Sequence, residues 1–217
     1  SLSSMVRMHP LHLALHRLLN SISYILSNFT KYYMHDEIVD KGYAIFKYDE
    51  PWYTHLYLGM VFQPLRKKDW ECEICKLTSG PIYNILKKYE YLAFGIYEEI
   101  INEHLYEHYE SPGSMSSVLY YWDGVGFHGE HTDWGFFNVL LFDESPNCFY
   151  VDDELVDCQG KGVILTGEGM EKYGLTATPH KVIKNSGHER YLATRQAYPI
   201  DKLQELDDKG GWNVASS

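Results

Sequence analysis

Residues 126–142 read Gly126-Phe-His-Gly-Glu-His131-Thr-Asp133-Trp-Gly-Phe-Phe-Asn-Val-Leu-Leu-Phe142, and the rest of the chain is best understood around this stretch. His131 and Asp133 stand two positions apart, immediately before an apolar run of strand length. Successive side chains of a strand point to opposite faces, so His131 and Asp133 are expected on one face, with Thr132 on the other. An imidazole and a carboxylate side by side are two of the three ligands of a facial triad, which holds Fe(II) and leaves coordination positions open.

A third ligand follows in Ala177-Thr-Pro-His180-Lys-Val-Ile, and an arginine follows it in Gly187-His-Glu-Arg190-Tyr-Leu-Ala-Thr194. A guanidinium can bind a carboxylate through two parallel hydrogen bonds. The sequence therefore predicts a metal site made of His131, Asp133 and His180, with Arg190 beside it to bind an anion.

A second His-x-carboxylate pair, His128 and Glu130, lies in the same stretch. We favour His131 and Asp133, because the apolar run begins directly after them, and His128 is then expected at the mouth of the pocket. Asn138 is the polar residue of that apolar run, and it either faces the pocket or makes a structural hydrogen bond.

The order of these residues resembles the Fe(II)/2-oxoglutarate-dependent dioxygenase superfamily, most closely the branch of isopenicillin N synthase and the plant 2-oxoglutarate oxygenases. The metal motif of that branch is similar to His131-Thr-Asp133-x-Gly135 here, and the resemblance covers roughly residues 117–199. It implies a jelly-roll core, also called a double-stranded β-helix. It further implies Fe(II), O2 and 2-oxoglutarate as cosubstrate, and hydroxylation of a substrate with release of succinate and CO2.

The resemblance also implies how 2-oxoglutarate is held. Arg190 would pair with the carboxylate far from the metal. The family usually has a serine two residues after this arginine, whereas this chain has Leu192. Thr194 or a tyrosine is a candidate for the second contact, and the tyrosine is Tyr120 or Tyr121, of which only one can face inward.

The composition is that of a packed globular protein. The chain has 217 residues, within the range of one domain, and it contains 19 Tyr, 9 Phe and 5 Trp. The net charge of −11 argues against binding nucleic acid through its phosphates. The expected partner is a small-molecule or peptide substrate, and the oligomeric state is left open.

The four cysteines, Cys72, Cys75, Cys148 and Cys158, are not spaced as a zinc or disulfide framework, so free thiols in a reducing compartment are expected. Residues 11–29 are interrupted by His, Arg and Asn, which argues against a membrane span, and they do not have the form of a signal peptide. We therefore expect a cytoplasmic protein.

The hydrophobic pattern predicts mainly β structure with flanking α-helices. Helices are expected over residues 11–33 and 81–108, and an irregular region over 53–80. His104 and His108 are interpreted as a solvated helix end. Strands are expected over residues 41–48, 117–122, 148–151, 162–166, 180–183 and 190–194. A helical turn followed by a loose tail is expected from residue 201 onward. Within a single oxygenase domain, 1–217, residues 1–110 would form a helical and irregular support and residues 115–200 the jelly-roll core that carries the metal site.

Two alternatives stay open. Leu192 favours a catalytically idle jelly roll that serves as a binding or scaffold protein, and the intact triad speaks against it. A nucleobase-directed oxygenase keeps the chemistry, but that branch generally has a second arginine six residues after the first, whereas Arg195 follows Arg190 at five.

Overall fold

The computed structural model describes residues 31–105, 115–184 and 187–199. Its 11 strands form one curled antiparallel sheet in the order β1-β9-β6-β11-β4-β3-β5-β10-β7-β8, and β2 pairs with β3. The fold is a mainly β jelly roll, as the sequence predicted.

The elements follow one another along the chain with these bounds. The strands are β1 (Tyr43–Phe46), β2 (Gln63–Lys67), β3 (Trp70–Leu77), β4 (Met115–Tyr121), β5 (Phe127–His131), β6 (Phe137–Phe142), β7 (Phe149–Val151), β8 (Glu154–Leu155), β9 (Gly162–Thr166), β10 (His180–Val182) and β11 (Arg190–Ala197). The helices are the 3-10 turns η1 (Trp52–His55) and η3 (Glu168–Tyr173) and the α-helix α2 (Pro81–Ile101), and residues 31–41 are also helical.

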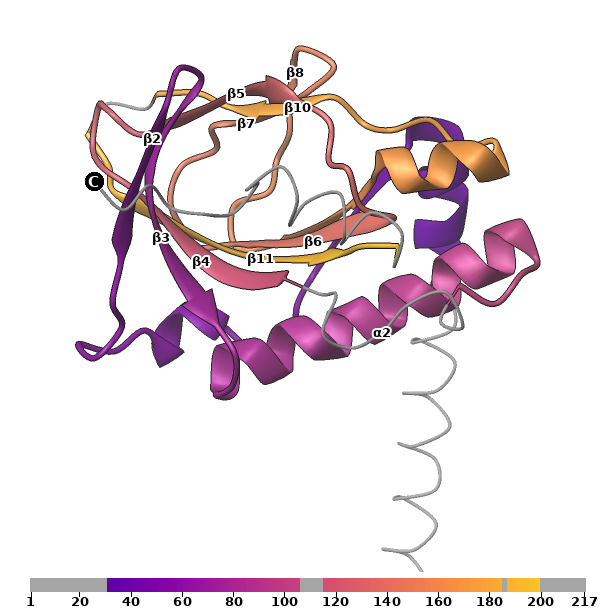
Figure 1. Cartoon of the computed structure of the whole chain (residues 1–217), viewed down its shortest axis with the longest axis horizontal. Coiled ribbons are helices and arrows are strands. Elements are labelled where there is room, and N and C mark those ends of the chain that lie inside the picture. Colours follow the sequence, from indigo (N-terminus) through magenta and orange to yellow (C-terminus); the bar gives the residue numbers. More distant parts are fainter. Residues whose placement is uncertain (1–30, 106–114, 185–186, 200–217) are drawn as a thin grey trace, which may run out of the picture.

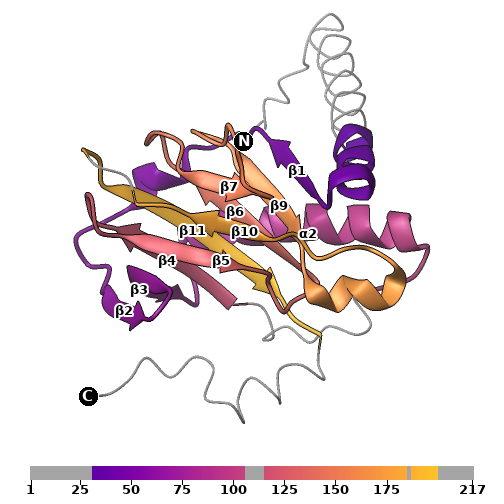
Figure 2. The same ribbon diagram turned by 90° about the horizontal axis from the view of Figure 1, so that it is seen from above.

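The curled sheet makes two layers (Figure 1). Strands β5, β7, β8 and β10 form the upper layer and lie over β4, β6 and β11, which form the lower layer. The view from above shows the same superposition (Figure 2). Strand β3 joins the layers, because it pairs with β4 along most of its length and with β5 at Trp70 and Glu71. The two layers therefore share one interior, into which every second side chain of each strand points.

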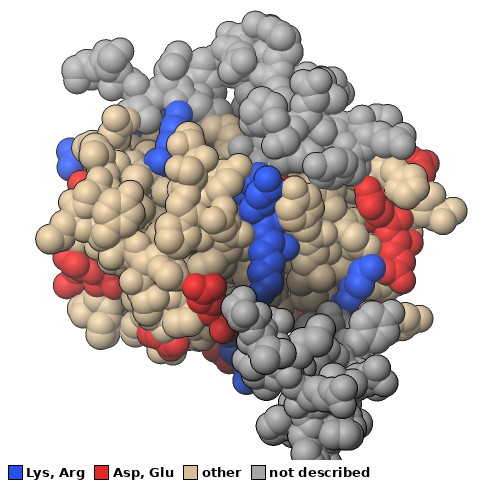
Figure 3. Space-filling view, turned by 90° about the horizontal axis from the view of Figure 1, so that it is seen from below, with Lys and Arg blue, Asp and Glu red and all other residues tan. Residues whose placement is uncertain are grey.

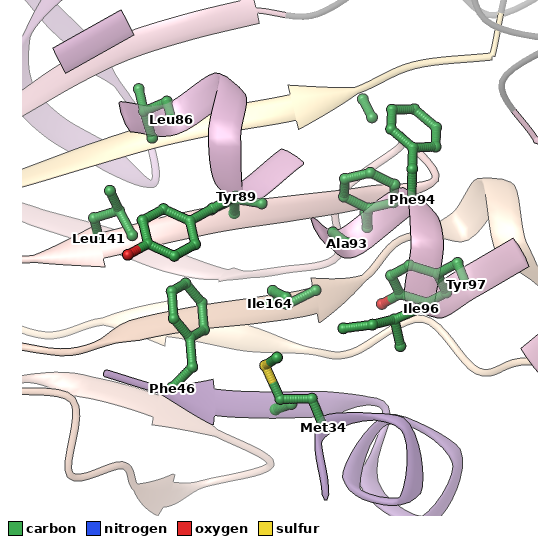
Figure 4. Packing of buried hydrophobic residues seen from close by; sticks show 14 of the residues in the cluster. Met34, Phe46, Leu86, Tyr89, Ala93, Phe94, Ile96, Tyr97, Leu141 and Ile164 are labelled. Atoms are coloured by element: carbon green, nitrogen blue, oxygen red, sulfur yellow. The ribbon is translucent and has the colours of Figure 1, made fainter. Parts of the chain in front are cut away.

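Helix α2 covers the outer face of the lower layer, where it contacts β4, β6 and β11. Pro81 stands in its first turn, where the missing N–H costs nothing, and Asn102 ends it in the left-handed conformation. Its apolar face, including Leu86, Ala93 and Tyr97, points into a fully buried cluster (Figure 4). The sequence predicted this packing and a longer helix, which in fact ends at Ile101.

A buried ion pair ties α2 to the sheet. Glu90 on the helix lies 2.8 Å from Nε of Arg195 on β11, and both side chains are 2% exposed. Nη1 of Arg195 also donates to the Ser116 hydroxyl at 2.6 Å. Arg195 therefore faces the helix side of the sheet, away from the interior, and has a structural partner there.

The face that carries α2 is seen from below in Figure 3. Basic side chains form a narrow strip across the described part of this face, and acidic groups lie mainly toward its two sides. Of the helices in the described segments, none combines the length and the hydropathy that crossing a bilayer would require.

One expectation about the first half needs correction. Residues 53–80 are not irregular, since β2 and β3 form a hairpin there and join the main sheet. The hairpin was missed because the turn around Lys68 and Asp69 lacks glycine and Pro64 interrupts the strand pattern, which an outer strand tolerates. The helix expected over 11–33 and the tail from 201 lie outside the described residues, except that residues 31–33 are helical.

Candidate metal centre

The two predicted histidine ligands are neighbours across two paired strands. His131 ends β5, His180 begins β10, and the two residues stand opposite each other in the antiparallel register. The Nδ1 atom of His131 lies 2.8 Å from the carbonyl oxygen of Gly129, and that of His180 lies 3.0 Å from the carbonyl of Thr178. A carbonyl oxygen only accepts, so Nδ1 carries the proton in both rings and Nε2 is left with its lone pair.

Asp133 lies outside the strand on which the sequence analysis placed it. Strand β5 ends at His131 and β6 begins only at Phe137, so Asp133 stands in the connection between them. The backbone of this connection is held from the other side, because the Asp133 carbonyl accepts from Glu168 N at 2.8 Å and the Gly135 carbonyl from Gly169 N at 2.9 Å. These contacts to η3 place the Asp133 carboxylate, although no strand alternation does so.

The three side chains converge. Nε2 of His131 is 3.9 Å from Oδ1 of Asp133, and Nε2 of His180 is 3.6 Å from Oδ2. One ligand atom from each residue can be chosen so that all lie within 4.8 Å of one another. Two imidazole nitrogens and one carboxylate oxygen in this arrangement fit a divalent first-row metal that keeps open positions.

Burial keeps the imidazole of His131 suited to this role. It lowers the pKa of His131, and His180 beside it lowers that pKa further. A neutral ring is the form that binds a metal.

Side chains of the lower layer hold the Asp133 carboxylate from behind. Nδ2 of Asn138 on β6 donates to Oδ2 at 2.9 Å, and Nε2 of Gln196 on β11 donates to Oδ1 at 2.6 Å. The Thr194 hydroxyl donates to Oδ1 of Asn138 at 2.7 Å, which turns the amide nitrogen of Asn138 toward Asp133. Asn138 thus faces the site, one of the two possibilities left open by the sequence.

His128 lies beside the centre, and Glu130 does not. The His128 ring stacks on His131 with centroids 3.9 Å apart, while Glu130 is exposed and pairs with Lys181 at 3.4 Å. Burial, followed by the neighbouring His131 and His180, holds the pKa of His128 well below its usual range. The competing pair His128 and Glu130 is therefore not assembled.

The centre opens into a cavity of about 380 Å³ between the two layers. Its walls come from inward-facing positions of β3, β4, β6 and β11, and they are mostly apolar. The lining includes Leu65, Lys67, Trp70, Cys72, Ile74, Leu119, Tyr121, Leu140, Trp134, Leu192, Thr194 and Tyr198 as well as the three metal-ligand candidates. A cavity of this size and character is typical of small-molecule sites.

Arg190 does not line this cavity and lines a separate small one. The side chains of Tyr121, Val182 and Leu192 line both cavities and so form the wall between them. Nη2 of Arg190 donates to the carbonyls of Gly126 at 3.0 Å and Ile183 at 2.6 Å. Its Nε and Nη1 are buried and have no hydrogen-bond partner among the described residues.

The strand register distinguishes the two candidate tyrosines. Tyr121 is 1% exposed, faces the interior and lies under the guanidinium of Arg190, 4.9 Å from the ring centroid. Its hydroxyl also has no partner among the described residues, and burial raises its pKa well above the usual value, so the phenol stays protonated. Tyr120 points to the opposite face, where it stacks on Tyr191.

The sequence analysis did not identify four residues that line the cavity: Gln196, Tyr198, Lys67 and Trp70. Of these, Gln196 donates a hydrogen bond directly to the carboxylate of Asp133. For Gln196 a signal existed, since it continues the inward series of Leu192 and Thr194 on the same strand. Lys67 and Trp70 could not be found while their hairpin was read as irregular. The cysteines are buried free thiols, as expected.

Comparison with known proteins finds similarity in structure but not in sequence. No protein-family model matches the chain, and no curated protein sequence does.

Three solved structures illustrate the structural similarity. A prolyl hydroxylase from Trichoplax adhaerens, bound to a hypoxia inducible factor oxygen degradation domain peptide, superposes with a TM-score of 0.56 at 14% identity, over 85% of this chain and 95% of that one. The rice dioxygenase for auxin oxidation gives 0.53 at 14%, over 85% and 91%. The Arabidopsis thaliana dioxygenase for auxin oxidation 1, complexed with 2-oxoglutarate, gives 0.51 at 13%, over 81% and 90%. The chain therefore has the jelly-roll fold of the Fe(II)/2-oxoglutarate oxygenases and carries a His-Asp-His metal site candidate within it.

Proposed function

We propose that this protein is an Fe(II)- and 2-oxoglutarate-dependent oxygenase that hydroxylates a small-molecule or peptide substrate. The observation that carries the proposal is the convergence of His131, Asp133 and His180 at one end of a mostly apolar cavity. We place it nearest the isopenicillin N synthase-like branch, on the motif His131-Thr-Asp133-x-Gly135. Its four buried free thiols support a cytoplasmic location.

The metal ligands are supported by their surroundings. Both imidazoles are fixed with Nε2 toward the Asp133 carboxylate, and both carboxylate oxygens receive an amide N–H. Such outer contacts orient ligands and strengthen metal binding. Bound Fe(II) would supply the activation of O2, coupled to oxidative decarboxylation of 2-oxoglutarate to succinate and CO2.

The anion site for 2-oxoglutarate is supported by three orphaned donors. The Nε and Nη1 groups of Arg190 and the hydroxyl of Tyr121 are buried without partners among the described residues. A buried cation and a buried phenol left without acceptors are costly, and a carboxylate would satisfy them together. Since Leu192, Val182 and Tyr121 separate Arg190 from the larger cavity, binding requires that this wall opens.

Other residues of the cavity would exclude water from the metal centre or orient the side chains that hold its ligands. The apolar walls Ile74, Leu119 and Leu140 keep water from the cavity, which protects a reactive centre from side reactions. Thr194 would act through Asn138, because its hydroxyl is already used to orient that amide.

The test is spectroscopic. Under anaerobic conditions, Fe(II) with 2-oxoglutarate should produce the weak visible charge-transfer band of a chelated keto acid. His180→Ala should abolish the band, whereas His188→Ala, which removes an exposed histidine outside the site, should leave it unchanged.

Substitution Arg190→Ala should require much more 2-oxoglutarate for the same band. If the wild type shows metal binding but no band even at millimolar 2-oxoglutarate, the oxygenase assignment fails. The separation of Arg190 from the main cavity would then favour the idle binding protein.

A further inference from the structure

Among the described residues that line the main cavity, Lys67 is the one lysine or arginine, whereas Arg190 lines the separate small cavity. Histidines aside, the described residues that line the cavity include two with formal charges, the metal-ligand candidate Asp133 and Lys67. Lys67 ends β2 and stands opposite Trp70 in the β2–β3 hairpin. Its side chain is exposed, so its ammonium group lies at the rim of the cavity.

Lys67 is available to a ligand. Its Nζ lies over the Trp70 ring, 5.0 Å from the ring centroid. Within the described residues Lys67 has no carboxylate partner, whereas Lys41, Lys88, Lys161 and Lys181 each have at least one. In a chain with a net charge of −11, an unpaired lysine at a cavity is a specific local attraction for an anion.

Trp70 links this lysine to the metal centre. Its ring lies edge-on to His128, with centroids 4.0 Å apart, and 5.8 Å from the ring of His131. Lys67, Trp70 and His131 thus follow one another along the same wall. If the anionic group of a ligand pairs with Lys67, the rest of the ligand would pack against the Trp70 ring and extend toward the metal centre.

The other lining residues indicate the chemical character of the rest of the ligand, apart from its anionic group. The other walls near the hairpin are Leu65, Ile74 and Leu119, and Trp134 lies at the metal end. A volume of about 380 Å³ has to hold the cosubstrate as well, so little room is left for a second ligand. This combination suits one anionic group on a compact apolar or aromatic body.

We propose that the primary substrate is a small apolar carboxylic acid, and that Lys67 selects it by pairing with its carboxylate while Trp70 packs against its body. The inference rests on the oxygenase function proposed above and adds its substrate class. Lys67 is a specificity-determining residue in this view and has no part in holding metal or 2-oxoglutarate.

The experiment uses the full chain loaded with Mn(II), which replaces Fe(II) without reacting, and with 2-oxoglutarate. The probes are matched acids and primary amides of equal shape: phenylacetate and phenylacetamide, indole-3-acetate and indole-3-acetamide, 4-methylpentanoate and 4-methylpentanamide. Paramagnetic broadening of the probe protons by Mn(II) reports binding beside the metal. At least one acid should bind about tenfold more tightly than its amide, the effect of one charge-assisted hydrogen bond.

Three variants test whether the positive charge of Lys67 causes the preference for the acid over the amide. Lys67→Met keeps the aliphatic stem and should reduce the affinity for the acid to that for the amide, while Lys67→Arg should retain the preference. Lys68→Met removes the same charge one residue away, at a position that does not line the cavity, and should change nothing.

The outcomes separate the two proposals. Equal binding of every acid and its amide by the wild type, or an equal loss in Lys67→Met and Lys68→Met, overturns the assignment of Lys67. Absence of Mn(II) or 2-oxoglutarate binding instead overturns the proposed oxygenase function, because Lys67 contributes to neither.

Discussion

At the scale of single residues, the Asp133 carboxylate shows how much of a metal site lies behind its ligands. Each of its oxygens receives one amide N–H, from Asn138 or from Gln196. These two side chains come from different strands, so the orientation of one carboxylate depends on the register of the sheet. They are positioning residues, and their removal should affect metal affinity without removing a ligand.

We predict that Gln196→Ala lowers the affinity for Mn(II) or Co(II) by about 10- to 100-fold, the usual effect of losing an outer contact to a metal ligand. Competition with a chelator measures it. The control is Gln159→Ala, at an exposed glutamine whose amide bonds a backbone carbonyl far along the chain from the site. Unchanged affinity in Gln196→Ala would show that the amide does not orient Asp133.

Leu192 is the second residue whose replacement is informative. Leu192→Ser shortens the wall between Arg190 and the main cavity and supplies a hydroxyl beside the guanidinium. We predict that 2-oxoglutarate binds about tenfold more tightly, equivalent to one added hydrogen bond, as measured by anaerobic titration of the visible band.

Loss of a buried leucine also costs stability, about 2–5 kcal/mol for a change of this size. Leu165→Ser, in the same interior cluster but lining neither cavity, controls for that cost. If both variants bind 2-oxoglutarate as the wild type does, Leu192 is not the barrier.

At the scale of elements, the connection between β5 and β6 decides where Asp133 stands. Gly135 makes this possible, because a Cβ there would lie 2.4 Å from the carbonyl oxygen of Ala197, too close for any side chain. The neighbouring Phe136 N donates to the same carbonyl at 2.7 Å, so this backbone cannot withdraw without losing a hydrogen bond.

We predict that Gly135→Ala lowers the free energy of unfolding by several kcal/mol and weakens metal binding, because it displaces the connection that carries Asp133. Gly95→Ala is the matched contrast. It lies within α2, where the nearest heavy atom to a new Cβ is Nζ of Lys31 at 3.8 Å, and it should stabilise the protein by about 0.5–1 kcal/mol. Chemical denaturation measures both, and equal effects of the two substitutions would refute the steric argument.

At the scale of the whole molecule, the metal candidate site links the two layers, which are otherwise connected through the pairing of β3 with β4 and β5 and by packing. His131 and His180 belong to the upper layer, and Asp133 is held by Asn138 and Gln196 of the lower layer. A bound metal would therefore stabilise the closed jelly roll against separation of its layers.

We predict that divalent metal raises the melting temperature. At about 100 times the dissociation constant the stabilisation is about 2.7 kcal/mol, which for a chain of this length corresponds to roughly 5–10 °C. Differential scanning calorimetry with and without Mn(II) measures the shift. The same shift in His180→Ala would mean that the metal binds elsewhere.

Part of this structure followed directly from local sequence patterns. The jelly-roll class and the outer position of the helix from Pro81 agree with expectation, because hydrophobic periodicity is a property of neighbouring residues. His131, Asp133 and His180 also converge as expected, although contacts to η3, and not strand alternation, place Asp133. The β2–β3 hairpin did not follow, since its turn has no glycine and its strands carry charges.

The sequence by itself determined which residue types this protein offers to a metal and which faces of its strands are apolar. Only the tertiary structure decided that Tyr121 and not Tyr120 faces the interior, that Leu192 stands between Arg190 and the main cavity, and that Lys67 reaches the site. The physical reason is that these positions depend on the register between strands distant in sequence. A shift of one residue in that register would turn each of those side chains to the opposite face.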